Sequence, residues 1–223
     1  MHQTVDISVE HRVLDMNRKL AEEIKGVLTG KGIHAVEFTG AVGSGKTLLI
    51  EKIGKRLKEK GNGVAAIAGD VAGNDDYLRF LGAGFKAVNI NTGKECHLDA
   101  HYVEHALDDL DLTGIKYLFI ENVGNLVCPA DFPVGAHLRL VVISVTEGDD
   151  MVRKHPLLFT QTPFLVINKV DLAEYVEVSP DVLIRDYSKI NPKGKVFLTD
   201  AKHDKGVEQL VSAIESFFLK PLV

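Results

Sequence analysis

A glycine-rich segment that ends in a lysine and a threonine carries the strongest chemical signal in this sequence. Residues 40–47 are Gly-Ala-Val-Gly-Ser-Gly-Lys-Thr, which matches the spacing G-x-x-x-x-G-K-S/T between a predicted strand and a predicted helix. Backbone N–H groups of such a loop point at the phosphates of a nucleotide, at a helix start where the dipole favours anions. Lys46 would lie near the β- and γ-phosphates as a catalytic residue, and the Thr47 hydroxyl would bind Mg²⁺. The predicted nucleotide-binding residues here are Gly43, Ser44, Gly45, Lys46, Thr47 and Leu48.

Two later segments, each at the end of a predicted strand, have residues suited to recognise guanine. The first, Asn168-Lys169-Val170-Asp171, has the N-K-x-D pattern. The Asp171 carboxylate can accept from guanine N1–H and the 2-amino group together, whereas adenine has an acceptor at N1 and no amino group at C2. Lys169 is expected along the ring plane, and Asn168 against the phosphate-binding loop or the base edge. In the second segment Asp stands where related S-A-K loops have Ser, and the predicted contacts are Asp200, Ala201 and Lys202.

Carboxylates at the ends of other predicted strands are candidates for binding Mg²⁺ together with Thr47. Mg²⁺ prefers oxygen ligands, bound directly or through water. Asp70 follows the second predicted strand and Glu121 follows the fourth, while Asp75 could reach the γ-phosphate side and is also a candidate catalytic residue. The alternative is that these acids cap helix N-termini. No glutamine or arginine is assigned to position water or to act as a finger, so slow intrinsic hydrolysis of GTP to GDP is expected.

Cysteine and histidine residues form a second group that could bind a softer metal. Cys96-His97 is followed by His101 and His105, a spacing that predicts three imidazoles on one face of a helix. Cys128 follows another strand, and loops after parallel strands open on the same edge of a sheet, so the two thiols could approach each other. Thiolate and imidazole suit Zn²⁺, Ni²⁺ or Cu, and a symmetric dimer would double the ligand set. The alternative is two buried apolar thiols and a solvated helix face.

These residues require a scaffold in which many strand ends meet, and the apolar pattern predicts one. Its strands show no period-2 alternation, so both faces of the sheet are expected to be covered. We therefore predict an α/β P-loop NTPase fold with a mainly parallel seven-stranded sheet flanked by helices, in a single domain over residues 1–223 with an amphipathic helical extension at 1–30. The predicted strands are 33–39, 64–68, 86–90, 117–120, 140–143, 164–167 and 195–199, with helices at 47–60, 98–110 and 207–218.

Composition limits the classes of protein to which this chain can belong. Hydrophobic residues make up 45% and charged residues 26%, which is typical of a soluble globular protein and excludes a disordered tail or a collagen-like fibre. The formal net charge of −5 argues against a nucleic-acid partner bound through phosphate neutralisation. No apolar run reaches the about 18–20 residues that span a membrane, and no secretory signal is evident. We predict a cytoplasmic protein with neither a membrane nor a nucleic-acid partner.

Two longer segments resemble the HypB family of GTPases for hydrogenase nickel incorporation. Residues 92–100 are Thr-Gly-Lys-Glu-Cys-His-Leu-Asp-Ala, and residues 121–130 are Glu-Asn-Val-Gly-Asn-Leu-Val-Cys-Pro-Ala. The similarity extends from about Asn17 to the C-terminus and includes 69–71 and 145–149. The resemblance implies a P-loop metallochaperone that forms a homodimer in the GTP state, with Cys96, His97 and Cys128 binding Ni²⁺ or Zn²⁺ at the subunit boundary. His101 is added from helix spacing alone. The implied partners are a HypA-like nickel metallochaperone and the large subunit of nickel–iron hydrogenase.

The sequence differs from some members of that family, and other functions stay open. Residues 1–30 contain no cysteine, and there is no long histidine-rich tract, so any metal function is expected at the GTPase domain itself. One alternative is a regulatory GTPase with a purely structural zinc site, and another is a urease-type nickel chaperone. A small-molecule kinase could use the same phosphate-binding loop, but the pattern at 168–171 favours a guanine nucleotide.

Overall fold

The computed structural model describes residues 3–127 and 130–219 and contains one seven-stranded sheet. All neighbouring strands pair in parallel, in the order β3-β2-β4-β1-β5-β6-β7. The predicted parallel sheet is therefore confirmed. The strands are β1 (His34–Thr39), β2 (Gly63–Asp70), β3 (Lys86–Asn91), β4 (Ile115–Glu121), β5 (Leu138–Ser144), β6 (Phe164–Asn168) and β7 (Lys195–Leu198).

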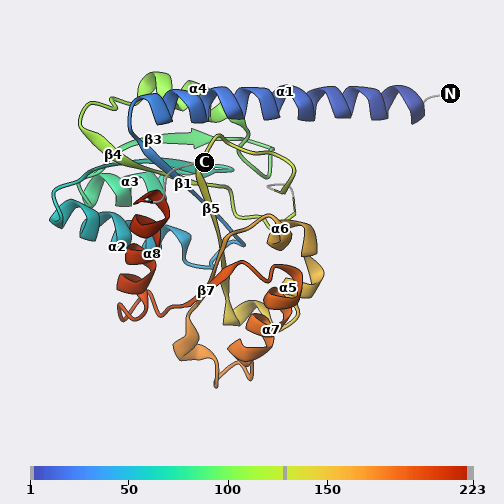
Figure 1. The fold of residues 1–223 in the computed structure, drawn as a ribbon, viewed down its shortest axis with the longest axis vertical. Helices are drawn as coiled ribbons and strands as arrows, with labels where there is room; N and C mark the ends of the chain where they lie inside the picture. Colours follow the sequence, from blue (N-terminus) through green and yellow to red (C-terminus); the bar gives the residue numbers. More distant parts are fainter. Residues whose placement is uncertain (1–2, 128–129, 220–223) are drawn as a thin grey trace.

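Helices cover both faces of this sheet, which explains why the central strands are apolar on both sides (Figure 1). Within β1, Ala35 packs with α1 and α4, whereas Val36 faces the opposite way and packs with α2, α3 and α8. Short helices α5, α6 and α7 cover β5 and β6. The helices are α1 (Gln3–Gly30), α2 (Lys46–Glu59), α3 (Asp75–Gly82), α4 (Ala100–Asp109), α5 (Met151–Lys154), α6 (Pro156–Thr160), α7 (Pro180–Ile190) and α8 (Val207–Leu219).

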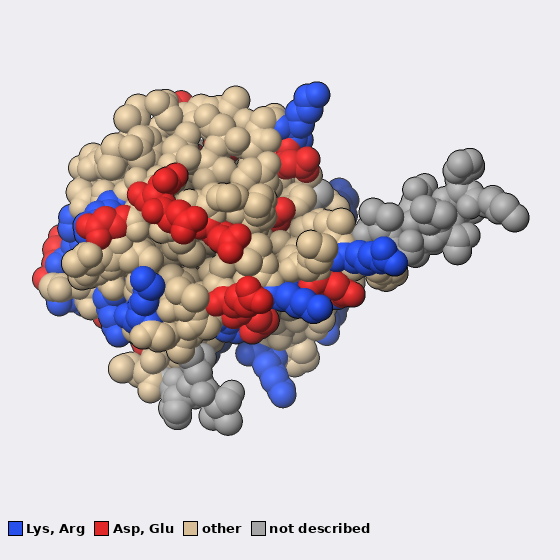
Figure 2. Space-filling view, turned by 90° about the horizontal axis from the view of Figure 1, so that it is seen from above, with Lys and Arg blue, Asp and Glu red and all other residues tan. Residues whose placement is uncertain are grey.

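Helix α1 confirms the predicted N-terminal helix and lies along one side of the molecule, with its N-terminal part extending beyond the body (Figure 1). Ala21, Ile24 and Leu28 are buried against the sheet side, whereas Val13 and Met16 are exposed. The view onto this side shows rows of acidic side chains with lysine and arginine between them (Figure 2). Within the described residues, no helix is long and apolar enough to cross a membrane.

The chain order of the strands creates a topological switch point at the carboxyl ends of β1 and β5. Strand β1 lies between β4 and β5, and the connections from β1 and from β5 run toward opposite ends of the sheet. In open α/β sheets, ligands bind at such a switch point, outside the carboxyl ends of the strands. The loops that follow β1, β2, β4, β6 and β7 therefore all lie at the carboxyl ends of the strands, around this switch point. These loops carry most of the predicted site residues.

Candidate functional site

The phosphate-binding loop connects β1 to α2 and depends on glycines with positive φ. Gly40 has φ +151°, and a Cβ there would lie 2.0 Å from the Val142 carbonyl oxygen. Gly45 has φ +99° and caps α2 without a side-chain hydrogen bond, and a Cβ there would lie 2.3 Å from Asn168 Nδ2. Only glycine fits both positions. The loop can therefore lie close against neighbouring strands while its N–H groups at the helix start are available to an anion.

Lys46 and Thr47 point to different parts of this loop. Lys46 is 6% exposed, and its ammonium donates to the carbonyl oxygens of Gly40 and Ala41, both at 3.0 Å. Burial lowers its pKa, although the charge of Glu121 opposes that effect. The Thr47 hydroxyl donates to Glu121 Oε1 at 2.8 Å. These contacts place a cation, a hydroxyl and a carboxylate around the start of α2.

A cavity of about 470 Å³ opens beside the loop. Asp70 lines it at the end of β2, and Glu121 lines it at the end of β4. Asp75, by contrast, is exposed and does not line the cavity; Asp76 and Arg79 of α3 line it instead. The sequence prediction missed both residues, because adjacent acids at a helix start differ only in helix phase. The remaining lining residues are Val42, Gly43, Gly45, Lys46, Thr47, Leu48, Gly69, Asn122, Gly124 and Lys169.

Two carboxylates, Glu121 in the lining of this cavity and the half-buried Glu147, are unusually basic. Burial, strengthened by the charge of Asp76, raises the pKa of Glu121 to about 8. Burial also raises the pKa of Glu147 to about 7. Each has one buried carboxylate oxygen without a hydrogen-bond partner in the described part of the chain. Glu121, with the Thr47 hydroxyl at its other oxygen, therefore fits a site for a cation with oxygen ligands.

Asn168 joins the three loops that the nucleotide prediction requires. Its Nδ2 donates to the Ser44 carbonyl oxygen in the phosphate-binding loop at 2.9 Å. Its Oδ1 accepts from Thr199 Oγ1 at 2.9 Å and from Ala201 N at 3.1 Å, both in the segment after β7. The residue is 2% exposed. Asn168 therefore connects these loops. Of its two expected positions, the one against the phosphate-binding loop is the one observed.

The remaining base-loop residues lie around Asn168. Lys169 has a left-handed backbone (φ +59°) and lines the cavity. Asp171 lies in the short helix η3 (Val170–Leu172). Asp200 is buried, whereas Lys202 is exposed. The structure thus brings the predicted phosphate and base segments together at the carboxyl ends of the strands.

The Cys96-His97 segment is a loop before α4 rather than part of a helix. Asp99 caps α4 by accepting from Tyr102 N, so the helix begins at Ala100. The predicted file of three histidines on one helix face is therefore wrong. His101 and His105 do lie together on α4, with ring centroids 4.4 Å apart, but His97 instead packs against Phe132.

The loop nevertheless keeps a cysteine and a histidine side by side. Cys96 Sγ and His97 Nδ1 are 3.8 Å apart. Burial lowers the pKa of His97, which favours the neutral imidazole that binds metals. Cys128 lies outside the described residues. Within the described part of the chain, Cys96, His97 and His101 do not bring three ligand atoms within 4.8 Å of one another.

Hydrogen bonds connect this loop to the segment after β4. Asn122 accepts from Leu98 N at 2.8 Å, and Asn125 donates to the Cys96 carbonyl oxygen at 3.2 Å. Asn125 also pairs with Gly40 in an isolated bridge at the phosphate-binding loop. The Cys96 loop and the phosphate-binding loop therefore share a common neighbour. These asparagine contacts could not be predicted from the sequence, because they join segments far apart in the chain.

Comparison with known proteins decides the family. Residues 34–198 match the model for the CobW/HypB/UreG nucleotide-binding domain. The probable hydrogenase maturation factor HypB of Methanocaldococcus jannaschii is 47% identical over 215 residues, which cover 96% of this chain and 97% of that protein. The chain belongs to the HypB family.

Solved structures of HypB proteins have the same fold. HypB from Archaeoglobus fulgidus is 44% identical, with a TM-score of 0.84, and the alignment covers 91% of this chain and 98% of that one. HypB from Helicobacter pylori in complex with nickel is 32% identical, also with a TM-score of 0.84, covering 90% of this chain and 94% of that one. Membership of the HypB family, first indicated by 92–100 and 121–130, is confirmed, and so is the P-loop NTPase fold.

Proposed function

We propose that this chain is a GTP-binding and GTP-hydrolysing metallochaperone. It couples GTP-dependent dimerisation to binding of nickel or zinc during maturation of nickel–iron hydrogenase. The observation that carries the proposal is the position of the Cys96-His97 loop. It is hydrogen-bonded to the segment that directly follows Glu121, so it adjoins the proposed nucleotide site. The name of the Methanocaldococcus jannaschii relative supports a role in hydrogenase maturation. The nickel complex of the Helicobacter pylori relative supports nickel as the cargo.

The nucleotide part of the proposal follows from the loops at the switch point. Lys46 would exchange its two carbonyl acceptors for oxygens of the β- and γ-phosphates, which leaves its ammonium hydrogen-bonded in both states. Asp171 would accept from guanine N1–H and the 2-amino group. Lys169, Asp200, Ala201 and Lys202 would form the rest of the base site, with Asn168 holding its loops.

Mg²⁺ is the cofactor that these residues fit. Thr47, Asp70 and Glu121 would hold it. The Glu121 oxygen that does not contact Thr47 is buried and has no hydrogen-bond partner in the described residues, so it is available as a metal ligand. Asp76, which lines the cavity, would take the role that was expected of Asp75. When bound, Mg²⁺ would neutralise charge on the β- and γ-phosphates.

The metal cargo would bind at the boundary between two copies of the chain. Cys96, His97 and Cys128 are the proposed ligands, with His101 as an addition, and a second copy would complete the coordination. A HypA-like metallochaperone and the hydrogenase large subunit would be the donor and the acceptor of the metal. Metal and nucleotide should then change each other's affinity reciprocally.

A nickel titration tests this coupling. Ni²⁺ binding would be followed by thiolate-to-nickel absorption with GDP and with a non-hydrolysable GTP analogue, and the sedimentation mass of the same samples would be recorded. We expect a dimer with the analogue and a changed nickel affinity or stoichiometry. Cys96→Ala should lose tight nickel binding and keep GTP binding, whereas Lys94→Ala, an exposed control in the same loop, should match the parent.

Two other outcomes separate the alternatives. Nickel or zinc binding that is indifferent to nucleotide would indicate a regulatory GTPase with a structural metal site. Parent-like nickel binding by Cys96→Ala would show that the assigned ligand is wrong. A urease-type role would appear as activation of apo-urease, and it gains some support because the Helicobacter pylori relative is named a hydrogenase/urease maturation factor.

A further inference from the structure

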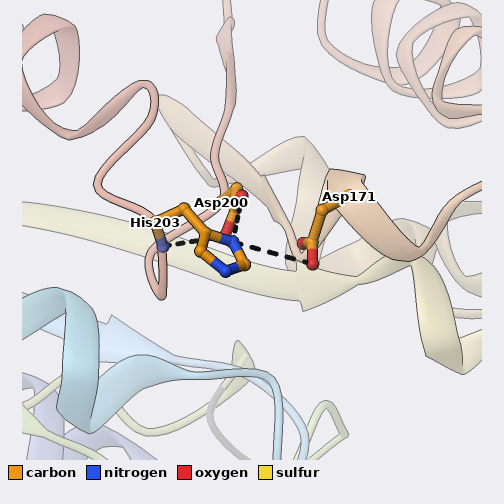
Figure 3. Close-up of side chains that lie close together, drawn as sticks. All are labelled: Asp171, Asp200 and His203. Carbon is orange, nitrogen blue, oxygen red and sulfur yellow. Dashed lines mark hydrogen bonds and ion pairs between the residues drawn. The ribbon is translucent and has the colours of Figure 1, made fainter.

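A histidine that belongs to none of the predicted motifs lies beside the proposed base-recognition carboxylate. The carboxylate of Asp200 is buried and accepts two hydrogen bonds from His203, one from the backbone N at 3.1 Å and one from ring Nδ1 at 2.7 Å. Ring Nδ1 of His203 faces both Asp200 and Asp171 (Figure 3). Its Nδ1 is 4.0 Å from Asp171 Oδ2.

One ring nitrogen of His203 lies beside two carboxylates that are close to each other. Ligand atoms of Asp171, Asp200 and His203 all lie within 4.8 Å of one another. Burial acts to raise the pKa of Asp200, but the hydrogen bonds from His203 outweigh it and leave that pKa lowered. Asp200 is therefore ionised at neutral pH. Without the ring donor, this buried negative charge would keep only its backbone hydrogen bond from residue 203, next to the carboxylate that guanine needs.

The same pair fixes the turn that carries the other predicted base contacts. Asp200 and Lys205 exchange backbone hydrogen bonds at 3.1 and 3.0 Å, which closes the turn. Ala201 N, the next residue along, donates to Asn168 Oδ1. A two-point bond from His203 to Asp200 thus stiffens a turn that is connected to Asn168 and, through it, to the phosphate-binding loop.

We infer that His203, held by Asp200, is a positioning residue that sets specificity for the guanine base. It keeps the Asp171 carboxylate directed at N1–H and the 2-amino group by fixing the position of the charged Asp200 carboxylate and by placing a donor N–H where the two carboxylates approach each other. This inference rests on the proposed guanine-nucleotide function and assigns a determinant of its specificity. The ring Nδ1–H donates to Asp200 in this role, so any side chain that supplies the same donor should substitute for it.

Competition binding with GDP, IDP and ADP tests the inference on the full chain. IDP lacks the 2-amino group, so the ratio of IDP to GDP dissociation constants measures the Asp171 contact. We expect His203→Ala to weaken GDP binding about tenfold and to reduce that ratio. His203→Asn, whose amide can donate to Asp200, should recover most of both.

Asp204→Asn is the matched control in the same turn. Asparagine tolerates the left-handed backbone at this position (φ +68°), and the change weakens the ion pairs of Asp204 with Arg56 and Lys52 without touching Asp200. It should leave the ratio unchanged. An unchanged ratio of IDP to GDP dissociation constants in His203→Ala would overturn the inference, even if both nucleotides bound more weakly. The proposed function would still stand in that case, provided that the parent prefers GDP over ADP. A parent that does not prefer GDP over ADP would overturn both.

Discussion

Replacing Glu121 with glutamine tests whether this buried carboxylate serves a cation. Glu121 accepts from Thr47 at one oxygen, and its other oxygen is buried without a partner in the described residues. Burial and the charge of Asp76 raise its pKa to about 8, although Lys46 opposes the shift. Glutamine keeps a carbonyl acceptor for Thr47 and removes the titrating proton. The substitution therefore isolates the effect of ionising one buried group.

The sign and size of that effect follow from proton linkage. The reference pKa of a glutamate is 4.5 and that of folded Glu121 is about 8, so between these values the folded state holds a proton that the unfolded state has lost. The free energy of unfolding of the ligand-free parent should then fall as pH rises, by about 1.4 kcal/mol per pH unit from this group. From about pH 6 to about pH 8 the loss is about 2–3 kcal/mol, equivalent to about 5–10 °C in Tm.

Thermal unfolding followed by circular dichroism measures this difference. Glu121→Gln should gain about 5–10 °C over the parent when the buffer changes from pH 6 to pH 8. Glu147 titrates in the same window, with a pKa raised to about 7, but its contribution is common to both proteins and cancels. Mg²⁺ with a GTP analogue should stabilise the parent at pH 8 much more than the variant. Parallel pH profiles for parent and variant would refute the reasoning, and the exposed control Glu95→Gln should follow the parent.

Two further predictions concern stability. Arg139→Met should lower the free energy of unfolding by about 3 kcal/mol, because it leaves the buried Glu37 carboxylate without its 2.7 Å ion pair. Urea denaturation measures this loss. A loss below about 1 kcal/mol would show that the hydrogen bond from Asn122 alone satisfies Glu37. His34 is partly buried, and burial lowers its pKa to about 4, so only the unfolded chain binds this proton between pH 6.5 and 4. Stability should fall as pH drops through that window, and His34→Phe should make the fall shallower in acid-dependent melting experiments.

The sheet could be predicted from the sequence because its strands are covered on both faces. Continuous apolar runs such as 140–143 and 164–167 have no other ready explanation in a chain with glycines and charged segments between them. Short helices were harder to predict. Helix α3 has eight residues, and α7 begins at Pro180 and buries little more than Leu183 and Tyr187, so neither has a long periodic pattern.

The site was predictable where chemistry depends on consecutive residues and not where it depends on helix phase or long-range contacts. The phosphate-binding loop and the segment at 168–171 are local patterns, and the structure places them together. Asp75 and Asp76 cannot be distinguished until the start of α3 is known. The histidine spacing was misleading for the same reason. Asp99 is the N-cap of α4, so His97 lies before the helix, and only His101 and His105 lie on it.

The end of β4 is the point at which the two halves of the proposed function meet. Glu121 contacts Thr47 on the nucleotide side. Asn122, the next residue, is 1% exposed and uses its amide to accept from Leu98 N and to donate to Glu37. A shift of Glu121 toward a cation would therefore displace the neighbouring Asn122, whose buried amide is hydrogen-bonded through both its oxygen and its nitrogen. Asn122 in turn contacts the backbone directly after Cys96-His97. An interaction of this kind acts equally in both directions. Metal bound at the Cys96 loop would bias the position of Glu121 as much as nucleotide biases the metal loop.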